Sequence, residues 1–166
     1  TMDQTNKSDV QSQFGKSAER YVTSKWHAKG GDLAKLVEIA DLHEQQRVLD
    51  VATGGGHVAN ALASSVNKVA AFDLTKEILA AAKSFIESNG HKNVDFVQGD
   101  AERMSFQDET FDVITCRIAA HHFPAPQSFV KESFRILKKG GQFLLIDNVA
   151  PERDDFDQFY NKVEKD

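Results

Sequence analysis

Five short apolar segments, separated by stretches of helical periodicity, set the strongest limit on the fold of this chain. Turn or helix signals follow each segment, as they follow the buried strands of a parallel sheet. Strands that alternate with helices in this rhythm form a parallel sheet with helices on both faces. The sequence therefore predicts a doubly wound α/β fold. The predicted strands are residues 47–51, 68–72, 94–97, 111–116 and 142–146.

Residues typical of helix ends bound the helical stretches. Asp32 and Thr75 are placed to act as N-caps of two helices. Gly90 is placed to end the second of these helices in the left-handed conformation. Lys138 and Lys139 are expected in the last turn of the helix before the fifth strand, where cations suit the helix dipole.

Charge and composition exclude several functions. The 166 residues carry a net charge of −5, whereas nucleic-acid-binding domains usually present a basic face. No apolar run approaches the ~20 residues of a membrane span, and residues 1–12 are polar, unlike a signal peptide. We therefore expect a cytoplasmic protein with no nucleic-acid partner and no membrane span. Its expected parts are an N-terminal helical cap (1–30) and one core (31–166).

A glycine-rich turn joins the first predicted strand to a helix, with the sequence Asp50-Val-Ala-Thr-Gly-Gly-Gly-His57. Glycines allow positive φ and let a ligand approach the backbone, and the helix that follows offers free N–H groups. In open parallel sheets, ligands bind at the carboxyl ends of the strands, where the strand order reverses. The turn is therefore the predicted ligand site, and a purely structural tight turn is the alternative.

Two cofactor classes fit this turn. Residues 54–59 match the dinucleotide fingerprint G-x-G-x-x-A, and Asp73 lies 19 residues after Gly54, where an acid that binds ribose belongs. These features do not separate a nicotinamide dinucleotide from S-adenosylmethionine. Asp50, however, would repel a pyrophosphate and attract an ammonium or a sulfonium group. Its position favours S-adenosylmethionine.

The chain resembles a known family over about residues 47–147. Asp50-x-Ala52-x-Gly54-x-Gly56 is similar to the D/E-x-G-x-G-x-G motif of class I S-adenosylmethionine-dependent methyltransferases, with alanine at the first glycine. This substitution is mild where the backbone needs no positive φ. The similarity is greatest to the small-molecule branch that includes ubiquinone/menaquinone-biosynthesis C-methyltransferases. Further motifs follow in order at residues 72–75, 99–102, 111–114 and 135–141.

The resemblance implies a Rossmann-like sheet of order 3-2-1-4-5 and a set of contacts to S-adenosylmethionine. It implies that Asp73, which Leu74 follows in the same motif, binds both ribose hydroxyls. Asp100 is expected to accept a hydrogen bond from the adenine amino group, and the Ala101 N–H to meet a ring nitrogen. Arg117 is expected either to offer its backbone carbonyl to the methionine ammonium or to pair its side chain with a surface acid.

Histidines and an N-terminal tyrosine complete the expected site. Tyr21 and His27 are expected to close over the methionine end of the cofactor. His121 and His122 follow the fourth strand, where the acceptor should dock, and an imidazole with a pKa near ~6.5 can remove a proton from it. Alternatively, one histidine packs or caps the next helix, and an acceptor with a lone pair needs no base. The histidines show no metal-ligand spacing, so no metal is expected.

The family's sheet has seven strands, of which this sequence supplies five. Strands 6 and 7 are expected to be missing from the chain as given, or a second subunit covers the apolar edge in a homodimer. The predicted function is methyl transfer from S-adenosylmethionine to a small organic acceptor by in-line displacement. The alternatives are a non-catalytic S-adenosylmethionine-binding module and, with less support, an NAD-dependent oxidoreductase.

Overall fold

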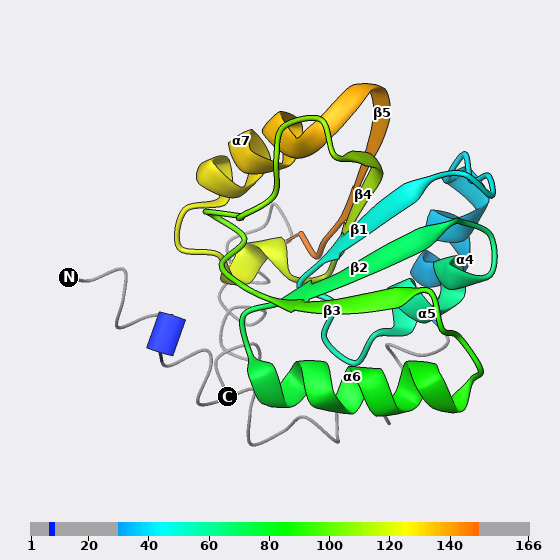
Figure 1. Ribbon diagram of the computed structural model, residues 1–166. Helices are drawn as coiled ribbons and strands as arrows, with labels where there is room; N and C mark the ends of the chain where they lie inside the picture. Colours follow the sequence, from blue (N-terminus) through cyan, green and yellow to red (C-terminus); the bar gives the residue numbers. More distant parts are fainter. Residues whose placement is uncertain (1–6, 9–29, 150–166) are drawn as a thin grey trace.

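The computed structural model describes residues 7–8 and 30–149, which fold around one five-stranded parallel sheet (Figure 1). The strand order is β3-β2-β1-β4-β5, so the predicted fold class and order are confirmed. The strands are β1 (Arg47–Val51), β2 (Lys68–Asp73), β3 (Val94–Gln98), β4 (Phe111–Arg117) and β5 (Leu137–Ile146). The helices are α4 (Gly31–Ile39), α5 (His57–Ala63), α6 (Lys76–Ser88), the 3₁₀ helix η1 (Ala120–His122) and α7 (Pro126–Ile136).

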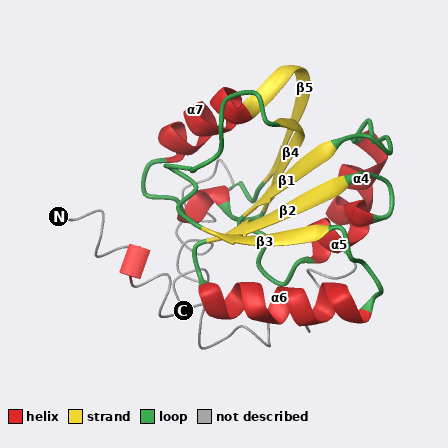
Figure 2. Cartoon of the chain, in the orientation of Figure 1, coloured by secondary structure: helices red, strands yellow, loops and turns green. Residues whose placement is uncertain are grey.

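Two apolar clusters, one on each face of the sheet, form the core, and helices cover both faces (Figure 2). On one face α4, α5 and α6 pack through Leu36, Leu62 and Ile86, which are all fully buried. On the other face α7 packs through Phe129 and Ile136. Helices on both faces leave the central strands no solvent face, which explains why these strands read as apolar runs rather than alternating ones.

The register of the sheet brings the carboxyl ends of the strands to one edge. Val51 at the end of β1 lies opposite Phe72 of β2 on one side and Cys116 of β4 on the other. Asp73, the next residue of β2, lies opposite Gln98 of β3. The segments that follow these strands therefore meet at the same edge of the sheet.

The first described helix starts earlier than predicted. Gly30 is the N-cap of α4, so Asp32 lies in the first helical turn, and its prediction as N-cap is wrong. The Asp32 carboxylate accepts hydrogen bonds from the Arg117 guanidinium, a stronger donor than a backbone N–H because it is charged. Arg117 lies 85 residues away, so the local pattern around Asp32 could not indicate this pairing.

The helix before β5 ends earlier than predicted. The ladder between β4 and β5 begins with Leu137 opposite Phe111, directly after α7. Lys138 and Lys139 therefore lie in β5, and their prediction as residues of the last helical turn is wrong. The ladder then has an irregular register before it resumes at Gln142, where the predicted strand began.

The turn after β1 keeps its backbone in the left-handed region at several positions. Gly54 and Gly56 have φ values of 54° and 82°, and Gly56 is the N-cap of α5. Ala52 also has a positive φ, 53°, so the condition under which alanine would be a mild substitution is not met. An L-residue in this conformation costs roughly 1–2 kcal/mol. The contacts made by this turn must offset that strain.

Some predictions fall at or beyond the limits of the described residues. The N-terminal cap (1–30), with Tyr21 and His27, lies outside them apart from residues 7, 8 and 30. β5 forms one edge of the described sheet, and Leu145 on it is 44% exposed. A second subunit over this edge stays a prediction. Across residues 7–8 and 30–149, no helix has the length and apolar character to cross a membrane.

We predict that Gly56→Ala destabilises the fold more than Gly90→Ala does. Both glycines have a positive φ, 82° and 86°, so both variants carry left-handed strain of roughly 1–2 kcal/mol. A Cβ at Gly56 would lie 2.8 Å from Ile86 Cδ1 and 3.1 Å from Ala82 Cβ, whereas a Cβ at Gly90 meets nothing within 4 Å. Overpacking should add about 1–3 kcal/mol at Gly56. Urea unfolding measures both losses, and equal losses would contradict the prediction.

Candidate functional site

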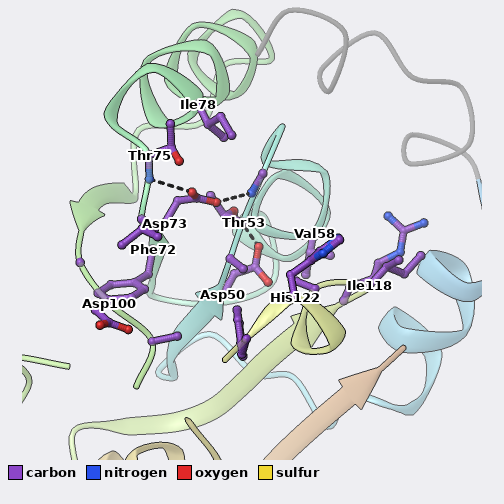
Figure 3. Close-up of a pocket in the computed structure, with 18 of the residues that line it drawn as sticks. Asp50, Thr53, Val58, Phe72, Asp73, Thr75, Ile78, Asp100, Ile118 and His122 are labelled. Carbon is purple, nitrogen blue, oxygen red and sulfur yellow. Dashed lines mark hydrogen bonds between the residues drawn. The ribbon is translucent and has the colours of Figure 1, made fainter. Parts of the chain in front are cut away.

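A pocket opens at the carboxyl ends of the strands (Figure 3). Its empty space, counted together with the open mouth, is about 1080 Å³. Its walls come from the turn after β1, the end of β2, and the segments after β3 and β4. The pocket therefore lies where the strand order reverses, the predicted place for a ligand.

Asp73, the last residue of β2, ties two walls of this pocket together. Its carboxylate accepts hydrogen bonds from the Gly54 N–H and the Thr75 N–H, each at 3.0 Å (Figure 3). Thr75 is the N-cap of α6, as predicted, although its side chain makes no capping bond. Asp73 is buried, and burial raises the pKa of its carboxyl. A carboxylate has about four lone-pair positions, so this one can still accept from a ligand.

Asp50 in β1 places a second carboxylate deeper in the pocket. The Thr53 hydroxyl donates to one of its oxygens and the Thr115 hydroxyl to the other, both at 2.7 Å. Asp50 is 1% exposed, and burial raises the pKa of its carboxyl to about 6. At neutral pH this group adds a buried negative charge to the pocket wall. Such a charge favours a cationic ligand over a pyrophosphate.

Asp100 supplies a third carboxylate, in the segment after β3. One oxygen accepts a hydrogen bond from the Glu102 N–H at 2.9 Å, and the other lies 2.7 Å from the Lys7 ammonium. Lys7 also pairs with the Glu102 carboxylate at 3.0 Å. Ala101 lies between the two acids on the pocket wall. A residue from the N-terminal part of the chain thus meets the corner predicted to receive the adenine.

The end of β4 and the residues after it form a further wall of the pocket. The Arg117 guanidinium forms an ion pair with Asp32, so the predicted pairing of its side chain with an acid is confirmed. This hydrogen-bonded pair lowers the pKa of Asp32 below its usual range. Ile118 has a φ of 52°, a strained conformation for a β-branched residue. Its N–H donates to the carbonyl of Ile146 in β5.

The two adjacent histidines of η1 have different surroundings. His122 lines the pocket, and Figure 3 shows it beside Ile118 in that wall. The Nδ1 of His121 lies 2.5 Å from one carboxylate oxygen of Asp147, and the His121 N–H donates to the other at 2.9 Å. The centroids of the two imidazole rings are 3.9 Å apart.

Most of the predicted site residues meet in this one pocket. Gly56 and His121 do not line it, because Gly56 lies against α6 and His121 is bonded to Asp147. Among the residues that the structure describes, no group of three or more metal-ligand side chains is arranged to hold a metal ion. The predicted residues that line the pocket are Asp50, Ala52, Gly54, Asp73, Leu74, Asp100, Ala101, Arg117 and His122.

Sequence reasoning missed several functional candidates. Thr115 holds Asp50 although it lies 65 residues away, because the register places the two residues opposite each other. Its signal was a polar residue inside an apolar predicted strand. Asp147 was also missed, and its signal was a carboxylate directly after the fifth strand. Ile78 and Phe123 supply apolar wall that no motif indicated.

The chain belongs to a family of methyltransferase domains. The family model, described as a methyltransferase domain, matches residues 49–145, which include the pocket segments after β1, β2, β3 and β4. The uncharacterized methyltransferase YcgJ of Bacillus subtilis (strain 168) is 43% identical over 152 residues, which cover 92% of this chain and 60% of that protein. A demethylmenaquinone methyltransferase of Bacillus pumilus (strain SAFR-032) is 27% identical over 168 residues, which cover 96% and 71%.

Solved structures agree with this assignment. A candidate methyltransferase from Bacillus halodurans C-125 is 67% identical, with a TM-score of 0.77 over 82% of this chain and 59% of that one. A SAM-dependent methyltransferase from Aquifex aeolicus is 29% identical, with a TM-score of 0.67 over 80% and 71%. The chain spans about 60% of the length of YcgJ and of the Bacillus halodurans protein.

Fold and family place the chain among Rossmann-like methyltransferase domains, a class whose solved member from Aquifex aeolicus is described as dependent on S-adenosylmethionine (SAM). The resemblance inferred from the motifs is thereby confirmed. The pocket fits such a cofactor, because Asp73 can accept from a ribose diol and Asp50 offers a negative charge to an ammonium group. The buried charge of Asp50 counts against the alternative of a nicotinamide dinucleotide, whose pyrophosphate it would repel.

We predict that Asp50→Asn stabilises the free protein at neutral pH. The pKa of about 6 in the folded protein exceeds the ordinary value of 3.8, so the ionised carboxylate opposes folding above pH 6. Below about pH 4 the carboxyl is protonated in both states and the effect disappears. Asparagine keeps the shape and can bond both threonine hydroxyls.

The free energy of unfolding at pH 7 should therefore rise by about 1–3 kcal/mol in Asp50→Asn. The gain should shrink as the pH falls from 6 and vanish near pH 4. Chemical denaturation at several pH values measures both trends. A variant that is less stable than the native protein at pH 7 would contradict the buried charge assigned to Asp50.

Proposed function

We propose that this protein transfers a methyl group from S-adenosylmethionine to a small organic acceptor. The observation that carries the proposal is the grouping of Asp50, Asp73 and Asp100 around one glycine turn in a single pocket. Three carboxylates suit a ligand that presents an ammonium, a sulfonium, hydroxyls and an amino group. Membership of the methyltransferase family supports the same reaction.

The nucleoside end of the cofactor is assigned to the walls after β2 and β3. Asp73 accepts hydrogen bonds from both ribose hydroxyls, with Leu74 next to it on the pocket wall. Asp100 accepts from the adenine amino group, and the Ala101 N–H donates to a ring nitrogen. The Lys7 ammonium already holds one oxygen of Asp100, so the adenine must share this carboxylate with Lys7 or displace it.

The methionine end is assigned to the space between β1 and β4. The buried negative charge of Asp50 attracts the ammonium group, and the Arg117 backbone carbonyl accepts a hydrogen bond from it. The glycine turn, with Ala52 and Gly54 in the pocket wall, leaves the backbone open to close approach. The proposed closing roles of Tyr21 and His27 stay predictions, since both residues lie outside the described part of the chain.

The chemistry needs few groups from the protein. S-adenosylmethionine supplies, when bound, a methyl group on a sulfonium that an acceptor can attack in line. The pocket contributes by holding the two reactants at close range and by excluding water. An acceptor that must lose a proton also needs a base within hydrogen-bond reach.

His122 is the proposed base, in preference to His121. Of the two, His122 lines the pocket, whereas the Nδ1 of His121 is bonded to Asp147. Ile118 and Phe123 flank this part of the wall with apolar surface, which suits a small acceptor with an apolar body and one acidic proton. A homodimer and a cytoplasmic location stay predictions.

We predict that Asp73→Asn weakens the binding of S-adenosylhomocysteine by about 10- to 100-fold. A hydrogen bond to a charged group contributes about 1.5–3 kcal/mol, and asparagine offers one oxygen where the carboxylate offers two. Isothermal titration calorimetry measures the affinity, and thermal melting checks that the variant folds. Asp95→Asn is the matched control, because its carboxylate lies in β3, paired with Lys68 and outside the pocket. An unchanged affinity in Asp73→Asn would remove Asp73 from the cofactor site.

We predict that His122→Ala lowers the rate of methyl transfer by at least about 100-fold, the lower limit usual for a general base. The assay follows labelled methyl groups from S-adenosylmethionine to a panel of small phenols, enols and amines. His91→Ala is the control, because His91 lies between α6 and β3, away from the carboxyl edge. Binding of S-adenosylhomocysteine without turnover of any acceptor would instead favour a non-catalytic binding module.

A further inference from the structure

Asp147 directly after β5 is a carboxylate that the proposed reaction does not use. One of its oxygens lies 2.5 Å from His121 Nδ1 and accepts from the Asn148 N–H at 2.8 Å. The other oxygen accepts from the His121 N–H at 2.9 Å. The side chains of His121 and Asp147 are 22% and 17% exposed. Asp147 thus binds both the backbone and the ring of the same histidine.

The ring of His121 in turn lies against the ring of His122. The two centroids are 3.9 Å apart and the ring planes are inclined by 44°. His122 lines the pocket, whereas neither His121 nor Asp147 does. A series of contacts therefore runs from the end of β5, through His121, to the imidazole in the pocket wall.

These contacts limit how the His122 ring can move. η1 is a 3₁₀ helix of three residues, and such a short turn gives its side chains little support of its own. The bond to Asp147 fixes the orientation of the His121 ring, as carboxylates do for histidines at catalytic and metal sites. A fixed His121 ring then blocks one side of the His122 ring. A base must be held within about 0.5 Å of its working position.

We propose that Asp147 and His121 are positioning residues that hold the His122 imidazole toward the pocket. The inference rests on the proposed function, in which His122 removes a proton from the acceptor. Neither residue touches the cofactor pocket. Their loss should therefore change the state of His122 and the turnover rate but leave cofactor binding intact.

The test is NMR of the histidine-labelled 166-residue chain, bound to S-adenosylhomocysteine, with the His122 ring signals assigned through His122→Ala. Asp147→Asn keeps the shape of the side chain. Its amide N–H group, however, faces either the backbone N–H or the Nδ1 of His121, where Asp147 has a carboxylate oxygen. His121→Phe keeps a flat ring beside His122 but loses the bond to Asp147. Both variants should shift or broaden the His122 ring signals, while the affinity for S-adenosylhomocysteine stays within about twofold. Asp95→Asn should leave the signals unchanged.

Superimposable His122 signals in the native protein and in either variant would overturn the proposal. A turnover assay distinguishes a failure of the positioning proposal from a failure of the proposed function. With an acceptor found in the panel, Asp147→Asn should lower kcat at least tenfold with KM for S-adenosylmethionine unchanged. Displaced His122 signals with an unchanged kcat would refute the base role and keep the positioning role. A kcat lost in His122→Ala but kept in Asp147→Asn would refute the positioning role alone.

Discussion

The carboxylate of Asp73 is the constraint on which the site depends. Its two hydrogen bonds, to Gly54 in the turn and to Thr75 at the start of α6, join the segments that follow β1 and β2. The sheet register brings those segments together, and a backbone hydrogen bond from the Thr53 N–H to the Phe72 carbonyl extends the pairing just past the end of the strands. Asp73 continues the connection beyond them, so the same group shapes the pocket and faces the proposed ligand.

The pocket is built at some expense to stability. Asp50 is ionisable yet buried, and Ala52 and Ile118 hold left-handed backbone that L-residues disfavour. All three line the pocket. Strained backbone and buried charge concentrate at functional sites. The free energy of ligand binding can offset there the stability that such groups cost in folding. The core clusters on the two sheet faces, in which Leu36, Phe129 and Ile136 are fully buried, supply the compensating stability.

The fold was predictable because its signals are local, whereas much of the site was not. Apolar runs indicated the strands, and the glycine turn indicated the position of the pocket. The order of the strands followed from the family resemblance. Thr115, Asp147 and the partner of Arg117 depend on contacts across many residues, which no periodicity shows. The same reason explains the wrong N-cap at Asp32. Local propensity cannot weigh a backbone cap against an ion pair with a distant guanidinium.

The most direct test of the central claim is calorimetric titration of the protein with S-adenosylhomocysteine and, separately, with NAD. Three carboxylates around the glycine turn predict micromolar binding of S-adenosylhomocysteine, about −8 kcal/mol, and no heat of binding with NAD. The affinity should also weaken as the pH falls through about 6, where Asp50 loses its charge. Binding of NAD, with no response to S-adenosylhomocysteine, would contradict the account and make the turn a dinucleotide site.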